Sequence, residues 1–140
     1  DEETARSLIE TREAIGSSLL KIYYLQEFVK RPQRDIRVIV IGGEVIAASY
    51  RYPPHGDWRT NVAREGVSKP CPLTPELEEI SLKAYEAVGG GVLAIDCMES
   101  PEGLVVNEVN NNIEFRGLSS ATGVDVAEKI IEYAVEVMKK

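Results

Sequence analysis

The sequence predicts an α+β fold in which an antiparallel sheet carries its helices on one face. Two β-rich runs, 35–41 and 44–51, flank Gly42-Gly43, and the tight turn of a hairpin needs the positive φ that glycine adopts readily. The predicted elements follow in the order helix, three strands, helix, two strands, helix, which is typical of layered α+β proteins. With 140 residues, the chain has the length of one domain.

The N-terminal segment predicts a helix, a strand and a loop. Apolar side chains recur at helical spacing within residues 2–20, and Gly16 with the two serines that follow it marks the helix end. Residues 22–29 are rich in aromatic and β-branched side chains, which favours a strand. The segment 30–34 is polar and contains a proline, so we expect a loop there.

The middle of the chain predicts a long loop and a helix. Residues 52–72 hold four prolines with the single histidine and the single tryptophan, and we expect an ordered loop or lid. Thr74 then precedes Pro75 and an acidic residue, which is typical of a helix start. Three glycines from Gly89 onward would end this helix. Its buried face would comprise Leu77, Ile80, Ala84 and Val88.

The C-terminal part predicts two strands, a loop and a last helix. The apolar runs 92–98 and 104–110 are the strands, and residues 111–123 form the loop. Asp125 and Glu128 have the spacing of a capping box that opens a helix to residue 138. The residues expected to face inward are Val126, Ile130, Ala134 and Val137.

Charge and cysteine usage exclude several classes of protein. The 23 acidic and 16 basic side chains give a net charge of −7, which argues against nucleic acid as a partner. Cys71 and Cys97 form no CxxC pattern, so we expect two reduced, buried thiols rather than a disulfide or a zinc site. No apolar stretch reaches 18 residues and no secretory leader is visible, so we expect a cytoplasmic protein without a membrane partner.

The most informative chemical signal is a pair of carboxylates on the last two predicted strands. A three-residue turn would pair Ser100 with Leu104, which places Asp96 opposite Glu108, and Asn110 shares the face of Glu108. Asp96 stands in an apolar run, where a lone acid needs a partner. Two carboxylates and an amide oxygen suit Mg²⁺, while a solvated polar sheet face explains the pattern about equally well.

A cluster of donors in the predicted loop offers a second signal. Arg51, Arg59, Asn61 and Arg64 lie within 14 residues of an acidic chain, and guanidinium groups suit polyphosphate or carboxylate ligands. Alone, such a cluster is more often a solvated surface; beside a magnesium site, it favours phosphate binding. The sequence contains neither a P-loop nor a GxGxxG motif, and His55 belongs to no legible catalytic set.

With these residues in place, the chain resembles the C-terminal part of an ATP-grasp ligase of the RimK-like branch. The likeness rests on segments spread over nearly all of the sequence, and it is closest to the amino-group carrier protein ligases of lysine and arginine biosynthesis, LysX and ArgX. The segments are 26–29 with 35–37, 59–64, 89–92, Asp96, 107–110 with 114–115, and 122–125.

The resemblance implies a site for ATP and Mg²⁺. Adenine would lie against the backbone of Gln26, Glu27, Phe28 and Val29, and Asp35 would stand near the ribose or the phosphates. Arg51, Arg59 and Asn61 would face the phosphates, with Arg59 and Asn61 also at the acyl phosphate. The Mg²⁺ ligands would be Asp96, Glu108 and Asn110, and the residues near the other substrates would be Arg64, Arg116, Gly117 and Leu118.

The resemblance also implies a reaction. ATP would phosphorylate a terminal carboxylate of the acidic carrier protein LysW, and the α-amine of glutamate or 2-aminoadipate would then attack the acyl phosphate. The aminoadipate ligases resemble one another in having Asn followed by Ser or Thr where this chain has Gly117-Leu118, and the glutamate ligases have Gly-Phe there. Since this chain matches neither pattern, a ligase that accepts both amino acids is a reasonable expectation.

Two features of the resemblance concern the organisation of the protein. The phosphate-binding lysine and the upstream domain of the family have no counterpart in these residues, so we expect 1–140 to be the C-terminal portion of an ATP-grasp domain. The resemblance further implies a homo-oligomer, either a dimer or a tetramer. The alternatives are a glutamate ligase that acts on a ribosomal protein or a coenzyme, and a non-catalytic ATP-binding module.

Overall fold

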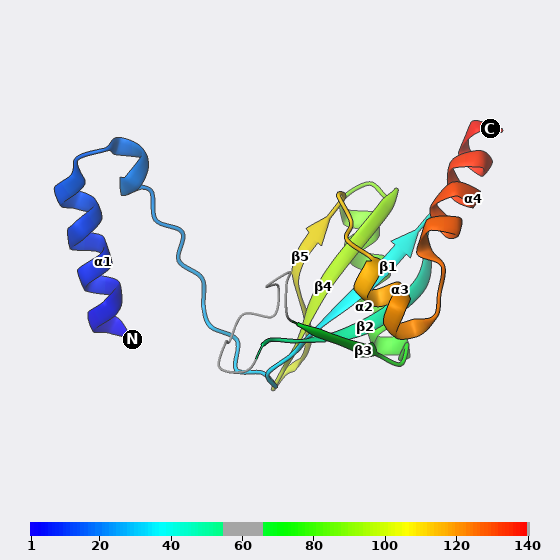
Figure 1. Ribbon diagram of the computed structural model, residues 1–140, viewed down its shortest axis with the longest axis horizontal. Coiled ribbons are helices and arrows are strands. Elements are labelled where there is room, and N and C mark those ends of the chain that lie inside the picture. The colour runs from blue at the N-terminus through cyan, green and yellow to red at the C-terminus, as the bar shows by residue number, and fades with distance from the viewer. Residues whose placement is uncertain (55–65, 140) are drawn as a thin grey trace.

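A five-stranded antiparallel sheet forms the centre of the protein (Figure 1). The computed structural model describes residues 1–54 and 66–139. The strand order is β3-β2-β1-β4-β5, which confirms the predicted α+β class. Along the chain, the elements are α1 (Glu2–Ile15), the 3-10 turn η1 (Ser18–Lys21), β1 (Asp35–Ile41), β2 (Glu44–Tyr52), β3 (Val67–Pro70), α2 (Pro75–Ala87), β4 (Val92–Ser100), β5 (Gly103–Asn110), α3 (Arg116–Thr122) and α4 (Val126–Met138).

The β1–β2 hairpin forms where the sequence predicts it. Gly42 and Gly43 both have positive φ, 60° and 87°, and Ile41 pairs with Glu44 across the two-residue turn. A β-bulge shifts the register between Ile39 and Val40. Part of the predicted loop at 52–72 lies outside the described residues, and its described end forms the strand β3, which pairs with the end of β2.

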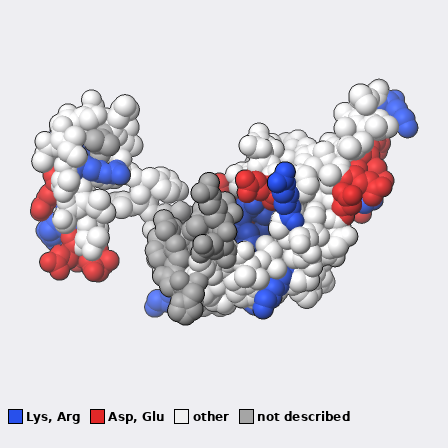
Figure 2. Space-filling model, viewed as in Figure 1, with Lys and Arg blue, Asp and Glu red and all other residues white. Residues whose placement is uncertain are grey.

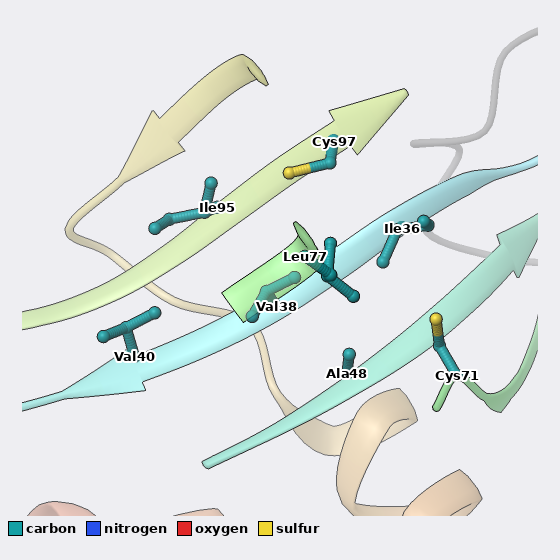
Figure 3. Packing of buried hydrophobic residues seen from close by; sticks show 8 residues of the cluster. All are labelled: Ile36, Val38, Val40, Ala48, Cys71, Leu77, Ile95 and Cys97. Carbon is teal, nitrogen blue, oxygen red and sulfur yellow. The ribbon is translucent and has the colours of Figure 1, made fainter. Parts of the chain in front are cut away.

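The two faces of the sheet carry different helices, which differs from the expectation that the helices share one face. α2 covers one face, where Leu77 lies in a cluster with Val38 and Ile95 (Figure 3). On the other face, Leu118 of α3 and Val126 of α4 pack against the strands. The prediction failed because a period-2 pattern shows that a strand has two faces but not which helix covers each one.

The predicted strand at 22–29 is wrong. In the structure this segment is an extended linker between η1 and the sheet (Figure 1), with Ile22 and Leu25 70% and 83% exposed. A strand needs a neighbour to accept its backbone hydrogen bonds, and no described strand lies beside this linker. The first helix ends where Gly16 and the two serines after it predicted, because Gly16 is its C-cap with a φ of 79°.

Three further expectations about helices differ from the structure. The predicted loop at 111–123 contains the helix α3. In α4, Val126 is buried while Ala134 and Val137 are exposed, because only the first turns of this helix reach the sheet. Val88, expected in the buried face of α2, lies beyond its end and is 55% exposed. Among the described helices, none is long and apolar enough to cross a membrane.

Candidate active site

The face of the sheet that carries α3 is apolar at one end and polar at the other. The polar end, which we call the polar face, comprises Asp35, Arg37, Arg51, Asp96, Glu108 and Asn110. The strand register places these side chains together: Asp35 pairs with Arg51, Arg37 with Asp96, and Asp96 with Glu108. Residues directly opposite on neighbouring strands point to the same side of the sheet, so the polar face draws side chains from four strands.

The predicted pairing of Asp96 with Glu108 is confirmed, although the predicted turn is not. The structure pairs Ser100 with Gly103 rather than with Leu104, which moves the register by one residue. A bulge between Asp96 and Cys97 then moves it back. Two residues of β5, 107 and 108, therefore occupy the space opposite Asp96, and the carboxylates of Asp96 and Glu108 belong to the same face.

An ion-pair chain runs across the polar face. Arg37 holds Asp96 with two hydrogen bonds of 2.9 Å, from Nε to Oδ1 and from an Nη to Oδ2. Arg51 donates two hydrogen bonds of 2.7 Å to Asp35, from Nε and Nη2. The same Nη2 also lies 2.9 Å from Oδ2 of Asp96. The side chain of Asp96 is 4% exposed and that of Arg51 is 13% exposed, so these charges depend on one another.

Burial and charge act in opposite directions on Arg51. Burial disfavours the charged guanidinium and on its own would lower the pKa. The hydrogen bond to Asp35 and the charges of Asp96 and Asp35 outweigh burial, so the pKa of Arg51 is raised. The two arginines and two aspartates of this ion-pair chain have no net charge together. Their mutual pairing explains how four charged side chains can occupy a position that is largely shielded from water.

The partner that Asp96 requires is therefore a pair of arginines. Three guanidinium contacts engage its two oxygen atoms, and an ionised carboxylate offers about four lone-pair positions. Glu108 is exposed, and Asn110 lies two residues further along β5, opposite Ala94. Asn110 is half-buried, and both residues add side-chain oxygen atoms beside the paired Asp96.

The donor set fits Mg²⁺ by its chemistry. Magnesium binds oxygen, keeps several waters, and commonly takes one or two carboxylates together with substrate phosphates. Asp96, Glu108 and Asn110 offer two carboxylates and one amide oxygen on one face. In the part of the chain that the structure describes, no group of three or more His, Cys, Asp and Glu side chains is placed to hold a metal, so any such site would rely on Asn110 and on the nucleotide itself.

Arg37 is the functional candidate that the sequence reading did not single out. Besides Asp96, it donates to the backbone oxygen of Glu114 at 3.2 Å, so it links the polar face to the segment after β5. Its signal was present in the sequence, since Arg37 is one charged residue inside the apolar run 35–41. Its partner could not be identified from the sequence because β1 and β4 are far apart along the chain and meet only in the sheet.

The other predicted site residues fall into three groups. Arg59, Asn61 and Arg64 lie outside the described residues. Gln26, Glu27, Phe28 and Val29 belong to the extended linker, where the backbone forms no regular structure. Arg116, Gly117 and Leu118 form the first turn of α3.

These three residues of α3 have different environments. Arg116 and Gly117 are exposed, whereas Leu118 is 2% exposed and lies in the core with Ile39. A Cβ added to Gly117 would stand 3.0 Å from the hydroxyl of Ser68 on β3. Gly117 therefore lets α3 approach β3 closely, and Leu118 anchors this first turn from below.

Charge is unevenly distributed over the surface. Figure 2 shows acidic side chains gathered over α4 and at the beginning of α1, and basic side chains over the sheet between them. On the polar face itself, each of the two arginines is paired with an aspartate.

Solved structures share this fold. A RimK domain ATP-grasp protein from Sphaerobacter thermophilus superimposes with a TM-score of 0.69, covers 95% of this chain and 45% of its own, and is 24% identical. The ATP-grasp ligase PsnB, in a complex with a precursor variant, Mg and ADP, superimposes with a TM-score of 0.61 at 21% identity, over 76% of this chain and 33% of its own. At these identities, the likeness concerns the fold.

Sequence comparisons identify the family. The glutamate–LysW ligase ArgX of Sulfolobus acidocaldarius is 40% identical over 91% of this chain and 46% of its own length. The α-aminoadipate–LysW ligase LysX of Sulfurisphaera tokodaii is 37% identical over 100% of this chain and 49% of its own length. The chain thus spans about half the length of these curated relatives. The model of the RimK-like ATP-grasp domain matches residues 1–134, and the chain belongs to this family.

Proposed function

We propose that this chain forms the C-terminal portion of an ATP-dependent ligase. The ligase joins the α-amine of glutamate or 2-aminoadipate to the C-terminal glutamate carboxylate of the carrier protein LysW. The names of the ArgX and LysX relatives support this substrate class. The observation that carries the proposal is the opposed pair Asp96 and Glu108. This pair shares one sheet face with Asn110 and with two arginines that are largely shielded from solvent.

The proposed chemistry proceeds in two steps, phosphorylation of a carboxylate and then amide formation. The carboxylate of LysW attacks the γ-phosphorus of ATP, so that ADP leaves and an acyl phosphate forms. The α-amine of the incoming amino acid then attacks the acyl carbon, phosphate leaves, and the amine loses a proton as the amide forms. Mg²⁺, when bound, would neutralise phosphate charge during these steps.

The residues of the chain would bind and orient the reactants. Asp96, Glu108 and Asn110 would hold Mg²⁺, while Arg51, Arg59 and Asn61 would face the phosphates. Asp35 fixes the guanidinium of Arg51 through two hydrogen bonds, so this cation is oriented before any ligand arrives. Catalysis would come mainly from positioning and charge stabilisation, with no covalent enzyme nucleophile.

The nucleotide and the amino acid would occupy regions on either side of the polar face. The backbone of Gln26, Glu27, Phe28 and Val29 would contact adenine, and Asp35 would lie toward the ribose or the phosphates. The amino acid would bind near α3, where Arg116 and Gly117 are exposed. Arg64 completes the proposed substrate set, whereas Leu118, which the resemblance placed near the substrates, lies in the core and would support the first turn of α3.

A second candidate is a glutamate ligase with a coenzyme as acceptor. A tetrahydromethanopterin:α-L-glutamate ligase of Methanococcus maripaludis is 41% identical over 85% of this chain and 41% of its own length. Such an enzyme would share the ATP site and differ in the acceptor.

We also propose that the full protein is a cytoplasmic homo-oligomer, a dimer or a tetramer.

A single assay separates these candidates. The full-length protein is incubated with ATP and Mg²⁺, with LysW or tetrahydromethanopterin as acceptor, and with glutamate or 2-aminoadipate. ATP binding, ADP release and the mass of each acceptor are recorded. The proposal predicts a LysW mass increase of one amino-acid residue for each ADP released. Modification of tetrahydromethanopterin instead of LysW would favour the second candidate, and ATP binding without turnover on any acceptor would indicate a non-catalytic module.

A further inference from the structure

The last residue before β1 is bound by side chains from two other strands. Arg34 forms two hydrogen bonds with the carboxylate of Glu99 on β4, at 2.7 and 2.8 Å. Its guanidinium carbon lies 4.0 Å from the ring centroid of Tyr50 on β2, and it donates to the hydroxyl of Tyr52 at 3.2 Å. We call Arg34, Glu99, Tyr50 and Tyr52 the Arg34 cluster.

The Arg34 cluster is built for geometry as well as for charge. A guanidinium fork fixes both the distance and the plane of its carboxylate partner, and the stacked ring adds a cation–π contact. The side chains of Arg34 and Glu99 are 27% and 28% exposed, so the pair is partly shielded from water. The pKa of Arg34 is raised, mainly by the hydrogen bond to Glu99.

The cluster lies on the opposite side of the sheet from the polar face. Tyr50 packs against the α2 side of the core, whereas the neighbouring Asp35 is held by Arg51 on the polar face. The side chains of the consecutive residues 34 and 35 thus form ion pairs on opposite faces of the sheet. This arrangement fixes both the position and the direction of the chain as it enters β1.

The linker folds into this anchor point. The guanidinium of Arg31 donates to the backbone oxygen atoms of Arg34 and Pro32. The backbone N–H of Arg34 in turn donates to the carbonyl oxygen of Pro32 at 2.6 Å. Upstream of this turn, the extended segment at 22–30 leaves the sheet, and α1 lies far from it (Figure 1). The direction of that segment is therefore set where the chain enters β1.

From this geometry we propose that Arg34 is a positioning residue, which holds the linker so that residues 26–29 stand at a fixed place relative to the polar face. The inference rests on the proposed function, in which residues 26–29 contact adenine and the polar face holds the phosphates. ATP spans these two regions, so an error in the linker direction would weaken nucleotide binding. Arg34 would act through the linker and would not touch the substrate.

The test compares conservative variants of the full-length enzyme. Arg34→Lys keeps the positive charge but removes the planar fork, and Glu99→Gln keeps the shape but removes the carboxylate charge. We expect each variant to raise the KM and the Kd for ATP by about five- to tenfold, with kcat changed less than about twofold. Because both substitutions disrupt the same Arg34–Glu99 pair, their effects should not add. The double variant should bind ATP no more weakly than the more impaired of the two single variants.

A matched control and a second measurement separate positioning from plain stability. Arg6 and Glu2 form an exposed ion pair on α1, and Arg6→Lys should leave the affinity for ATP unchanged. Hydrogen exchange of residues 22–33 should accelerate in Arg34→Lys, while the amides of β1 and β4 keep their protection. Unchanged Kd and KM for ATP in a variant with a lowered Tm would overturn the inference and leave Arg34 a structural residue.

The proposed function can fail separately. If the wild-type enzyme binds ATP and the Arg34 variants bind it equally well, the positioning role is wrong and the ligase proposal stands. If the wild-type enzyme binds no ATP, the proposed function is wrong and the role of Arg34 in nucleotide binding is wrong with it.

Discussion

Arg37 of β1 and Asp96 of β4 stand directly opposite each other, and two hydrogen bonds of 2.9 Å join the guanidinium to the carboxylate. The proposed metal ligand is therefore also the charge partner of two arginines, because Arg51 contacts the same carboxylate. A substitution of Asp96 would change both stability and metal binding. Glu108, exposed on the neighbouring strand, separates these two effects.

The first prediction contrasts Asp96→Asn with Glu108→Gln. Loss of one partner from a buried ion pair costs about 3–5 kcal/mol, so Asp96→Asn should lower the free energy of unfolding by that order as well as activity. Glu108→Gln lies at the surface and should change it by no more than about 0.5 kcal/mol. Denaturant unfolding measures both values.

The same two variants test the metal site. Loss of a residue that merely orients a ligand typically weakens metal affinity about 10- to 100-fold, so loss of a ligand itself should raise the Mg²⁺ concentration for half-maximal turnover at least as much. We expect this effect in Glu108→Gln. If that variant retains wild-type Mg²⁺ dependence, Glu108 is no ligand and belongs to the solvated part of the surface.

The second prediction concerns Arg59, which lies outside the described residues. If its guanidinium contacts the phosphates, Arg59→Ala removes a charge-assisted hydrogen bond worth about 1.5–3 kcal/mol. The kcat/KM for ATP should then fall by about 10- to 150-fold. Lys83→Ala is the control, since Lys83 pairs with Glu79 on the exposed side of α2. Equal kinetics in the two variants would assign Arg59 to the surface.

The third prediction is a loss of stability at high pH. Burial raises the pKa of the Cys97 thiol from its ordinary value near 9 to about 12. Below pH 9 the thiol is neutral in both the folded and the unfolded state, and its contribution is fully present. Between pH 9 and 12 only the unfolded state loses the proton, so the free energy of unfolding should fall by up to about 1.4 kcal/mol for each pH unit.

The pH prediction is checked by thermal unfolding from pH 8 to pH 11. Cys97→Ala removes the titrating thiol, so its stability should fall less steeply with pH than that of the wild type. Some slope should remain, because the pKa values of Cys71 and Tyr50 are also raised. Identical slopes in the two proteins would show that Cys97 does not titrate in this way.

The fourth prediction concerns the turn of the β1–β2 hairpin. Gly42 and Gly43 both have positive φ, so alanine at either position costs about 1–2 kcal/mol in backbone strain. A Cβ at Gly42 would also stand 2.8 Å from the ring of Tyr133 on α4, whereas a Cβ at Gly43 has its nearest neighbour at 3.9 Å. Gly42→Ala should therefore have the lower Tm of the two. Equal Tm values would show that α4 yields without cost.

Local signals predicted the hairpin and the helix caps well. Thr74 accepts a hydrogen bond from the backbone of Leu77, and Asp125 accepts one from Glu128, as helix N-caps do. These contacts join residues three positions apart, so the sequence contains all of the necessary information. The failed strand at 22–29 shows the opposite case, because a strand depends on a partner that composition does not reveal.

The candidate site was predictable in part for the same reason. The facing of Asp96 and Glu108 follows from one hairpin, and it was predicted correctly because the shorter turn and the bulge cancel in the register. The contact of Arg37 with Asp96 joins two residues that lie 59 positions apart in the sequence, on different strands. No periodicity within either strand could show which residue lies across from the other.

The last prediction places the choice of amino acid at the first turn of α3. Glutamate and 2-aminoadipate differ by one methylene, and a pocket distinguishes one methylene by about 1–3 kcal/mol. We therefore expect the ratio of the two kcat/KM values to lie below about 10³ in direct competition. Gly117→Asn should change this ratio about tenfold, because its new side chain must displace Ser68 and so reshape the space beside α3. Leu118 is left in place, since a polar residue in its core position would destabilise the helix itself. Ser120→Asn puts the same side chain on an exposed position of α3 and should leave the ratio unchanged. A wild-type ratio above 10³, or an equal response of the two variants, would place the specificity determinant elsewhere in the protein.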